Sequence, residues 1–122
     1  MNEANQKSIE RSGSTSRMSK IVRFGDLIFL CGQTSSGSDA SEIISQTDEV
    51  LRRIDALLAE AGSDRSRLLA VTIHLRSMSD FAAMNGCWER WLEGLPVPAR
   101  TTVQAELASP TLLVEMTVTA AS

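Results

Sequence analysis

The chain has 122 residues, of which 43% are hydrophobic and 22% charged, and its formal net charge is −3. This length and composition predict one soluble globular domain over residues 1–122. The acidic balance argues against a nucleic-acid partner, because such a surface needs an excess of Lys and Arg. One His and two Cys are too few for a His-based metal site. No apolar run approaches the ~20 residues that span a membrane.

The N-terminus has no feature of an export signal. Residues 1–6 are polar, lack the apolar core of a signal peptide, and are expected to be disordered. Cys31 and Cys87 form no C-x-x-C motif and are expected to be free thiols. These features predict a protein of the reducing cytoplasm.

Short strands are predicted at the start of the chain. Gly25-Asp26 separates two apolar runs and predicts a tight hairpin between them. Polar residues rich in Gly and Ser flank the hairpin on both sides and predict turns or loops. The strands predicted here cover residues 7–11, 18–24 and 27–33.

Two segments have the apolar period of an amphipathic helix. The first covers residues 40–61, where Asp39 and Glu42 resemble a capping box and Gly62 a C-terminal cap. The second covers residues 79–94. Arg52-Arg53, within the first helix, is predicted to be part of a solvated face. The predicted apolar faces consist of Ile43, Ile44, Val50, Leu51, Ile54, Leu57 and Leu58 in the first helix, and of Phe81, Met84, Trp88, Trp91 and Leu92 in the second.

Three more strands are predicted, over residues 68–76, 100–107 and 112–120. In the first of them, apolar and polar residues alternate as in a half-buried strand. A hairpin centred on Ser109-Pro110 would join the other two and place Glu115 opposite Gln104. The alternating residues are Val71, Ile73 and Leu75 on one side and Thr72, His74 and Arg76 on the other.

The order of these elements predicts an α+β fold in which both helices cover one face of one sheet. The other face would then be bare, with ligand sites at the seams of a homo-oligomer that covers it. The residues expected on this bare face are Thr72, Arg100, Thr102, Gln104 and Glu115.

Arg100 and Glu115 are the main candidates for a functional site. Each is a lone charge in a strand-like run, and such a charge must be solvated or used in a site. The planar guanidinium of an arginine grips a carboxylate with two parallel hydrogen bonds. A glutamate can orient and deprotonate a water molecule. The pair is therefore suited to hold a small anion and a water.

Five short motifs follow one another in a distinctive order along the chain. They are Gly25-Asp26-Leu27-Ile28-Phe29-Leu30-Cys31-Gly32-Gln33, Ile54-Asp55-Ala56-Leu57-Leu58-Ala59-Glu60-Ala61-Gly62-Ser63, Asp80-Phe81-Ala82-Ala83-Met84-Asn85, Pro98-Ala99-Arg100-Thr101-Thr102-Val103 and Val114-Glu115-Met116. This ordered set resembles the Rid family, the RidA/YjgF group, and is most similar to its YoaB-like branch. The resemblance extends from Met18 to Ala121, nearly the whole chain.

The resemblance implies a chorismate-mutase-like α+β fold, assembled as a homotrimer whose sheets line a central barrel. It implies inter-subunit sites that hydrolyse 2-imino and 2-enamino acids to 2-keto acids and ammonia without a cofactor. Arg100 would hold the substrate carboxylate and Glu115 would position the water. The other residues expected to contact substrate are Cys31, Gly32 and Thr102, through backbone N–H groups near them, together with Met18 and Asn85.

Three positions depart from the family pattern. Cys31 stands where a Ser is frequent, Thr102 where a Cys is frequent, and Met18 where one branch has a pocket Tyr. The loss of that hydroxyl leaves open a non-catalytic module that binds or senses a small carboxylate. A ribonuclease or translation inhibitor is a third reading, which the acidic charge and the single His disfavour.

Overall fold

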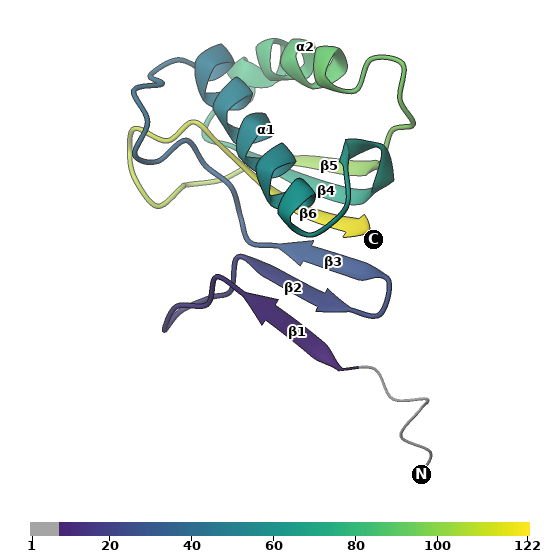
Figure 1. Ribbon diagram of the computed structural model, residues 1–122. Helices are drawn as coiled ribbons and strands as arrows, with labels where there is room; N and C mark the ends of the chain where they lie inside the picture. The colour runs from purple at the N-terminus through teal and green to yellow at the C-terminus, as the bar shows by residue number, and fades with distance from the viewer. Residues whose placement is uncertain (1–7) are drawn as a thin grey trace.

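The computed structural model describes residues 8–122, so the disorder expected for residues 1–6 lies outside the described residues. One six-stranded sheet carries two α-helices on one of its faces (Figure 1). The strands are β1 (Ile9–Ser12), β2 (Ile21–Phe24), β3 (Leu27–Leu30), β4 (Leu68–Leu75), β5 (Ala99–Gln104) and β6 (Val114–Ala121). The helices are α1 (Ile43–Glu60) and α2 (Phe81–Trp91), with 3-10 turns η2 (Arg65–Arg67) and η3 (Met78–Asp80).

The strand order is β1-β2-β3-β6-β4-β5, with β5 at one edge of the sheet. The predicted hairpin between the last two strands is wrong, because β4 lies between β5 and β6. Helix α2 carries the chain across the sheet, so β5 lies parallel to β4, as in a β-α-β crossover. Glu115 consequently lies opposite His74, and Gln104 lies beside Leu75.

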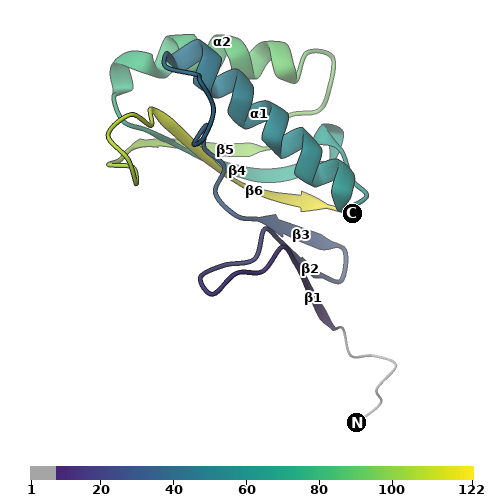
Figure 2. The same cartoon turned by 60° about the vertical axis from the view of Figure 1, so that its left-hand side comes forward.

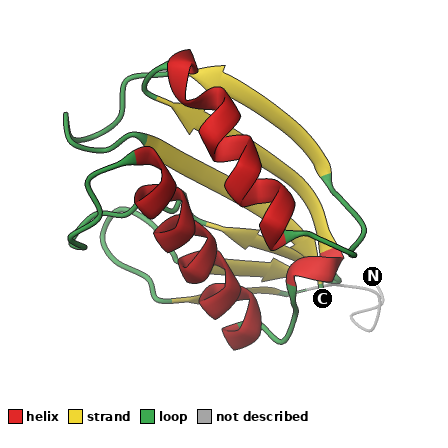
Figure 3. Ribbon diagram, turned by 90° about the horizontal axis from the view of Figure 1, so that it is seen from above, coloured by secondary structure: helices red, strands yellow, loops and turns green. Residues whose placement is uncertain are grey.

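The helix-covered face of the sheet holds the hydrophobic core (Figures 2 and 3). Val71 is 2% exposed and Ile73 and Leu75 are fully buried, which confirms the predicted alternation in β4. Arg100 and Thr102 are in register with Val71 and Ile73, respectively, and so share their face. The prediction that Arg100, Thr102 and Gln104 lie on the bare face is therefore wrong, since parallel pairing with β4 sets their orientation.

No helix of residues 8–122 covers the opposite face of the sheet, which we call the open face (Figure 2). It is partly apolar: Phe24, Leu27, Phe29 and Val103 are 42%, 39%, 40% and 40% exposed. Glu115 lies on this face, as predicted, because its neighbours Val114 and Met116 are fully buried on the other side. A homo-oligomer that covers the open face remains a prediction.

Both helices are shorter than predicted. Helix α1 begins at Ile43, and its capping box starts at Glu42, where it was expected at Asp39. The hydroxyl of Ser45 accepts a 3.3 Å hydrogen bond from the backbone N–H of Glu42. Residues 78–80 form the turn η3, and α2 ends at Trp91. Gln104 accepts a hydrogen bond from the backbone N–H of Met78 at 3.2 Å, which fastens this turn to β5.

Gln46 fastens α1 to the loop that leads into β6, and it is only 1% exposed. Its amide N–H donates to the carbonyls of Ala40 (3.3 Å) and Thr111 (2.9 Å), and its carbonyl accepts from the N–H of Leu113 (2.8 Å).

We expect Gln46→Leu to lower the free energy of unfolding by about 2 kcal/mol, because backbone groups lose their partners. Urea unfolding measures the change. Glu60→Gln, at an exposed helix position, should stay within about 0.5 kcal/mol of wild type; equal stabilities of the two variants would contradict this reading of Gln46.

Candidate functional site

Arg100 is held against α2 by one hydrogen bond and two aromatic rings. Its Nη1 donates to Oδ1 of Asn85 at 2.8 Å. Its Cζ lies 5.5 Å from the ring centroid of Trp88 and 5.8 Å from that of Phe81. Cation–π attraction and the amide oxygen thus fix the guanidinium at the edge of the sheet. The sequence predicted Phe81 only as a core residue, but it is 38% exposed beside the arginine.

Arg100 and its neighbour Thr102 have unused bonding capacity. Among residues 8–122, no carboxylate forms an ion pair with Arg100. The buried Oγ1 of Thr102, two residues along the same face of β5, has no hydrogen-bond partner within the described chain. A buried hydroxyl without a partner is unfavourable, so Thr102 is a polar group that the single chain leaves unsatisfied. We call Arg100, Asn85 and Thr102 the arginine half-site.

Glu115 lies directly beside Gly32. The strands β3 and β6 separate here and rejoin at a bridge in which the N–H of Gln33 donates to the carbonyl of Met116 at 2.8 Å. A Cβ at position 32 would collide with Oε2 of Glu115, so only glycine leaves room for the carboxylate in this position. Among the described residues, Glu115 forms no ion pair. We call Gly32, Glu115, Cys31 and Met18 the glutamate half-site.

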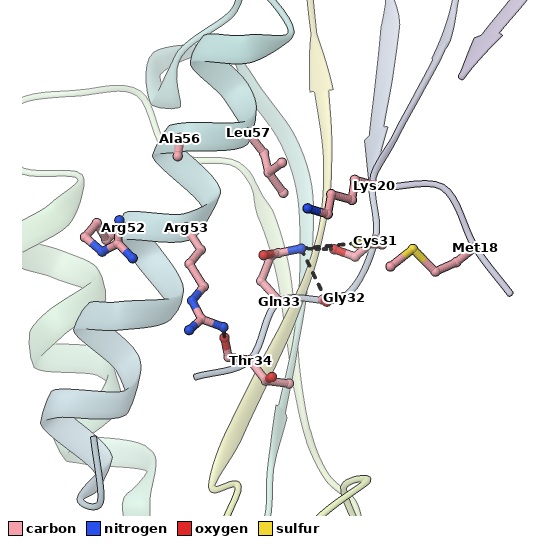
Figure 4. Close-up of a pocket in the computed structure, with 10 residues that line it drawn as sticks. All are labelled: Met18, Lys20, Cys31, Gly32, Gln33, Thr34, Arg52, Arg53, Ala56 and Leu57. Carbon is pink, nitrogen blue, oxygen red and sulfur yellow. Dashed lines mark hydrogen bonds between the residues drawn. The ribbon is translucent and has the colours of Figure 1, made fainter. Parts of the chain in front are cut away.

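Cys31, Gly32 and Met18 line a cavity of about 450 Å³ between the strands and α1 (Figure 4). The backbone N–H of Cys31 donates to the carbonyl of Lys20 at 3.0 Å, so it is not the free ligand donor that was expected. The side-chain amide of Gln33 donates to the carbonyls of Cys31 (3.0 Å) and Gly32 (3.4 Å). Within residues 8–122, the N–H of Gly32 makes no hydrogen bond, so it is the donor still available there.

The cavity also contains basic residues that the sequence did not single out. Lys20, Arg52 and Arg53 line it, although the arginine pair was predicted to lie on a solvated face. Arg52 is largely exposed, with 67% of its side chain accessible, but Arg53 is only 28% accessible and donates to the carbonyl of Thr34 at 2.8 Å. The segments that bring them together are distant in the sequence, so no local pattern could have revealed the cluster.

A single chain does not bring the two half-sites together. Arg100 is in register with Val71, and Val71 with Val118, three residues beyond Glu115. Two strand spacings of ~4.8 Å and three residues of ~3.3 Å place the Cα atoms of Arg100 and Glu115 on the order of 14 Å apart. Their side chains also point to opposite faces of the sheet. The two half-sites of one chain therefore do not form a single pocket.

Two further features bear on what the site could bind. Over residues 8–122, no three His, Cys, Asp or Glu side chains gather as metal ligands do. None of the helices in this part of the chain is both long enough and apolar enough to cross a membrane.

Comparisons with known proteins agree on one family. Residues 8–122 match the family model described as Endoribonuclease L-PSP. The chain is 38% identical to the RutC family protein YoaB of Escherichia coli (93% of this chain, 97% of the relative). It is 36% identical to a RutC family protein of Haemophilus influenzae (92% of this chain, 97% of the relative). The crystal structure of a YjgF family protein from Neisseria meningitidis superposes with a TM-score of 0.90 at 41% identity, covering 94% of this chain and 95% of that one.

Proposed function

The chain belongs to the RutC/YjgF family, whose model is described as Endoribonuclease L-PSP, and we propose that it is a cofactor-free imine deaminase. Its substrates are 2-imino and 2-enamino acids, which it hydrolyses to 2-keto acids and ammonia. The family was anticipated from the sequence motifs, and the comparisons confirm that prediction. The activity itself rests on the chemistry of the two half-sites.

The observation that carries the proposal is the unpaired Arg100. A guanidinium fixed by Asn85 and two rings, without an anionic partner in residues 8–122, is preorganised to receive a carboxylate. The hydroxyl of Thr102, on the same face, has no partner within the described chain and is a second polar group near the arginine. Every 2-imino acid carries a carboxylate adjacent to its C=N carbon, so binding at Arg100 also places the reacting carbon.

Glu115 then has the role of handling protons. Its carboxylate accepts a proton from water as the oxygen attacks the C=N carbon of the protonated imine, which gives a carbinolamine. The proton returns to nitrogen, and the C–N bond breaks as the C=O bond forms. Ammonia leaves, and the proton of the hydroxyl passes to Glu115 and then to ammonia, which gives ammonium and restores the carboxylate. One water is consumed and one ammonia released, with no oxidant, reductant or metal in the balance. Since a protonated imine is already electrophilic, no side-chain nucleophile is required.

We further propose that the two half-sites meet between subunits. Arg100 is on the edge strand β5, and its partner groups are too distant within one chain. A homotrimer would place the arginine half-site of one protomer against the glutamate half-site of the next, and the apolar open face would be covered. Sedimentation equilibrium of the full chain tests this assembly; a monomer at assay concentrations would contradict it.

The activity is tested with imines made in situ. An amino-acid oxidase generates 2-iminopropanoate and 2-iminobutanoate, and semicarbazide traps what remains. We expect the wild-type protein to speed the loss of imine and the release of keto acid in proportion to its concentration. Equal rates with and without the protein, across both imines, would overturn the proposal.

A binding module is the second candidate, and Met18 is the observation that favours it. This side chain lines the cavity beside Cys31 and Gly32 and offers no hydroxyl to a ligand. Saturable thermal stabilisation by 2-oxobutanoate, without turnover of any imine, would support binding alone. The family description also names an endoribonuclease, and RNA cleavage that disappears in Glu115→Gln and Arg100→Ala would favour that activity instead.

Gly32→Ala offers an independent check on the glutamate half-site. The added methyl would displace the Glu115 carboxylate without disturbing Arg100, so we expect kcat to fall at least tenfold with little change in KM. Steady-state kinetics on 2-iminobutanoate measures both constants. Gly86→Ala is the matched control, because a Cβ there meets only Arg90 Nη1, at 3.5 Å, an ordinary contact. Wild-type kcat in Gly32→Ala would show that the position of the carboxylate is unimportant.

A further inference from the structure

The cavity beside the glutamate half-site is lined by positive charge only. Three of its lining residues are basic, namely Lys20, Arg52 and Arg53, and none is acidic. Figure 4 shows Lys20 on the strand side and both arginines on α1, with Gln33 and Gly32 between the helix and the strands. The net charge of the protein is −3, so this cluster of cations is opposite in sign to the chain as a whole. The cavity should therefore attract anions.

The acid that is bonded to the two arginines neutralises these cations only in part. Glu49 binds Nε (2.9 Å) and Nη2 (2.6 Å) of Arg52 and Nε of Arg53 (2.6 Å). These hydrogen bonds lower the pKa of Glu49 from 4.5 to about 2, so it carries one negative charge at neutral pH. That charge is shared by two arginines, and Lys20 forms no ion pair within residues 8–122. Lys20, Arg52, Arg53 and Glu49 together therefore carry a net charge of +2, three cations less one anion, and the Glu115 carboxylate lies at the Gly32 end of the cavity.

The position of this charge determines what it would bind. Cys31 and Gly32 border the cavity, and the Glu115 carboxylate lies against Gly32 from the open face, so Gly32 is the point at which the cavity and the proposed site adjoin. A substrate anchored by its first carboxylate at Arg100 would extend its side chain into about 450 Å³ of space that ends at Lys20 and Arg53. Small apolar side chains would leave this space and its charges unsatisfied.

We propose that Lys20 and Arg53 form a subsite for a second carboxylate, so that the preferred substrates are 2-imino dicarboxylic acids. This inference rests on the imine deaminase activity proposed above and adds a substrate class to it. Carboxylate is the anion expected, because 2-imino acids derive from amino acids, whose anionic side chains are carboxylates. Lys20 supplies a mobile ammonium, and Arg53 supplies the guanidinium N–H groups that Glu49 and Thr34 do not occupy.

The test compares substrates of one and two negative charges. Imines of glutamate and aspartate are generated in situ beside 2-iminobutanoate, and kcat/KM is measured for wild type, Lys20→Met and Arg53→Met. We expect wild type to favour the dicarboxylic imines, and each variant to lose about tenfold on them by losing a hydrogen bond to a charged group. Activity on 2-iminobutanoate should stay within about twofold of wild type for Lys20→Met. Arg67→Met, which removes a charge at an exposed position, is the control.

Each outcome separates this inference from the activity on which it rests. Hydrolysis of all imines without a dicarboxylic preference, or equal losses on both substrate classes, would overturn the subsite and leave the deaminase standing. If no imine is hydrolysed, calorimetric binding of glutarate against butyrate decides the subsite alone. Tighter binding of glutarate that weakens in Lys20→Met would support it, and equal binding in wild type and variant would overturn it. The unfolding midpoint of Arg53→Met is measured together with its kinetics, because this variant also loses the hydrogen bond from Arg53 to the carbonyl of Thr34.

Discussion

Replacement of Arg100 with alanine should reduce kcat/KM on 2-iminobutanoate by at least about 100-fold. The guanidinium would make two charge-assisted hydrogen bonds to the substrate carboxylate, and losing both corresponds to about 3 kcal/mol or more. Because one carboxylate fixes both the affinity and the position of the C=N carbon, KM should rise and kcat should fall. Steady-state assays with imine generated in situ measure the two constants separately.

Two variants make the Arg100 result specific. Arg100→Lys keeps the charge but not the planar fork, so it should recover part of the affinity and lie between wild type and alanine. Asn85→Ala leaves the charge intact and removes the 2.8 Å hydrogen bond that orients it, so its loss should be smaller, about tenfold. A fully active Arg100→Ala protein, with unchanged assembly, would eliminate the proposed carboxylate site.

The fold class could be predicted because the residues that define it follow local periodicity. The alternation from Val71 to Arg76 marks β4, and the apolar stripe from Val50 to Leu58 marks α1; both lie where they were predicted. Strand pairing is not local. Nine residues, 105–113, connect β5 to β6, and a connection of this length is compatible with several strand orders. The observed order, with β4 between β5 and β6, depends on the packing of α2 over the sheet.

The same missing information explains which parts of the site were misplaced. Arg100 and Thr102 were recognised as unusual residues, but their face depends on pairing with Val71 and Ile73, which the sequence of β5 does not encode. The closeness of Gly32 and Glu115 depends on a bridge between Gln33 and Met116 that joins residues far apart in the chain. Individual chemical candidates could thus be found from residue type, whereas their geometry required the whole sheet.

Glu115→Gln should lower kcat by about 100- to 1,000-fold, the usual contribution of a positioned general base. Glutamine has nearly the same shape and can still bind a water, but it cannot accept a proton as the water attacks. KM should change little, because Arg100 continues to hold the carboxylate. The loss is therefore in kcat, the chemical step. Lys20→Met should behave differently, because its loss of kcat/KM depends on the charge of the substrate.

A shortened side chain decides whether Glu115 acts on protons or only supports the structure. Glu115→Asp keeps a base but moves it back from Gly32, so it should recover activity above that of the glutamine variant. If Glu115→Gln retained wild-type kcat, water activation would have to come from elsewhere, and the N–H of Gly32 would be left as the functional group of the glutamate half-site.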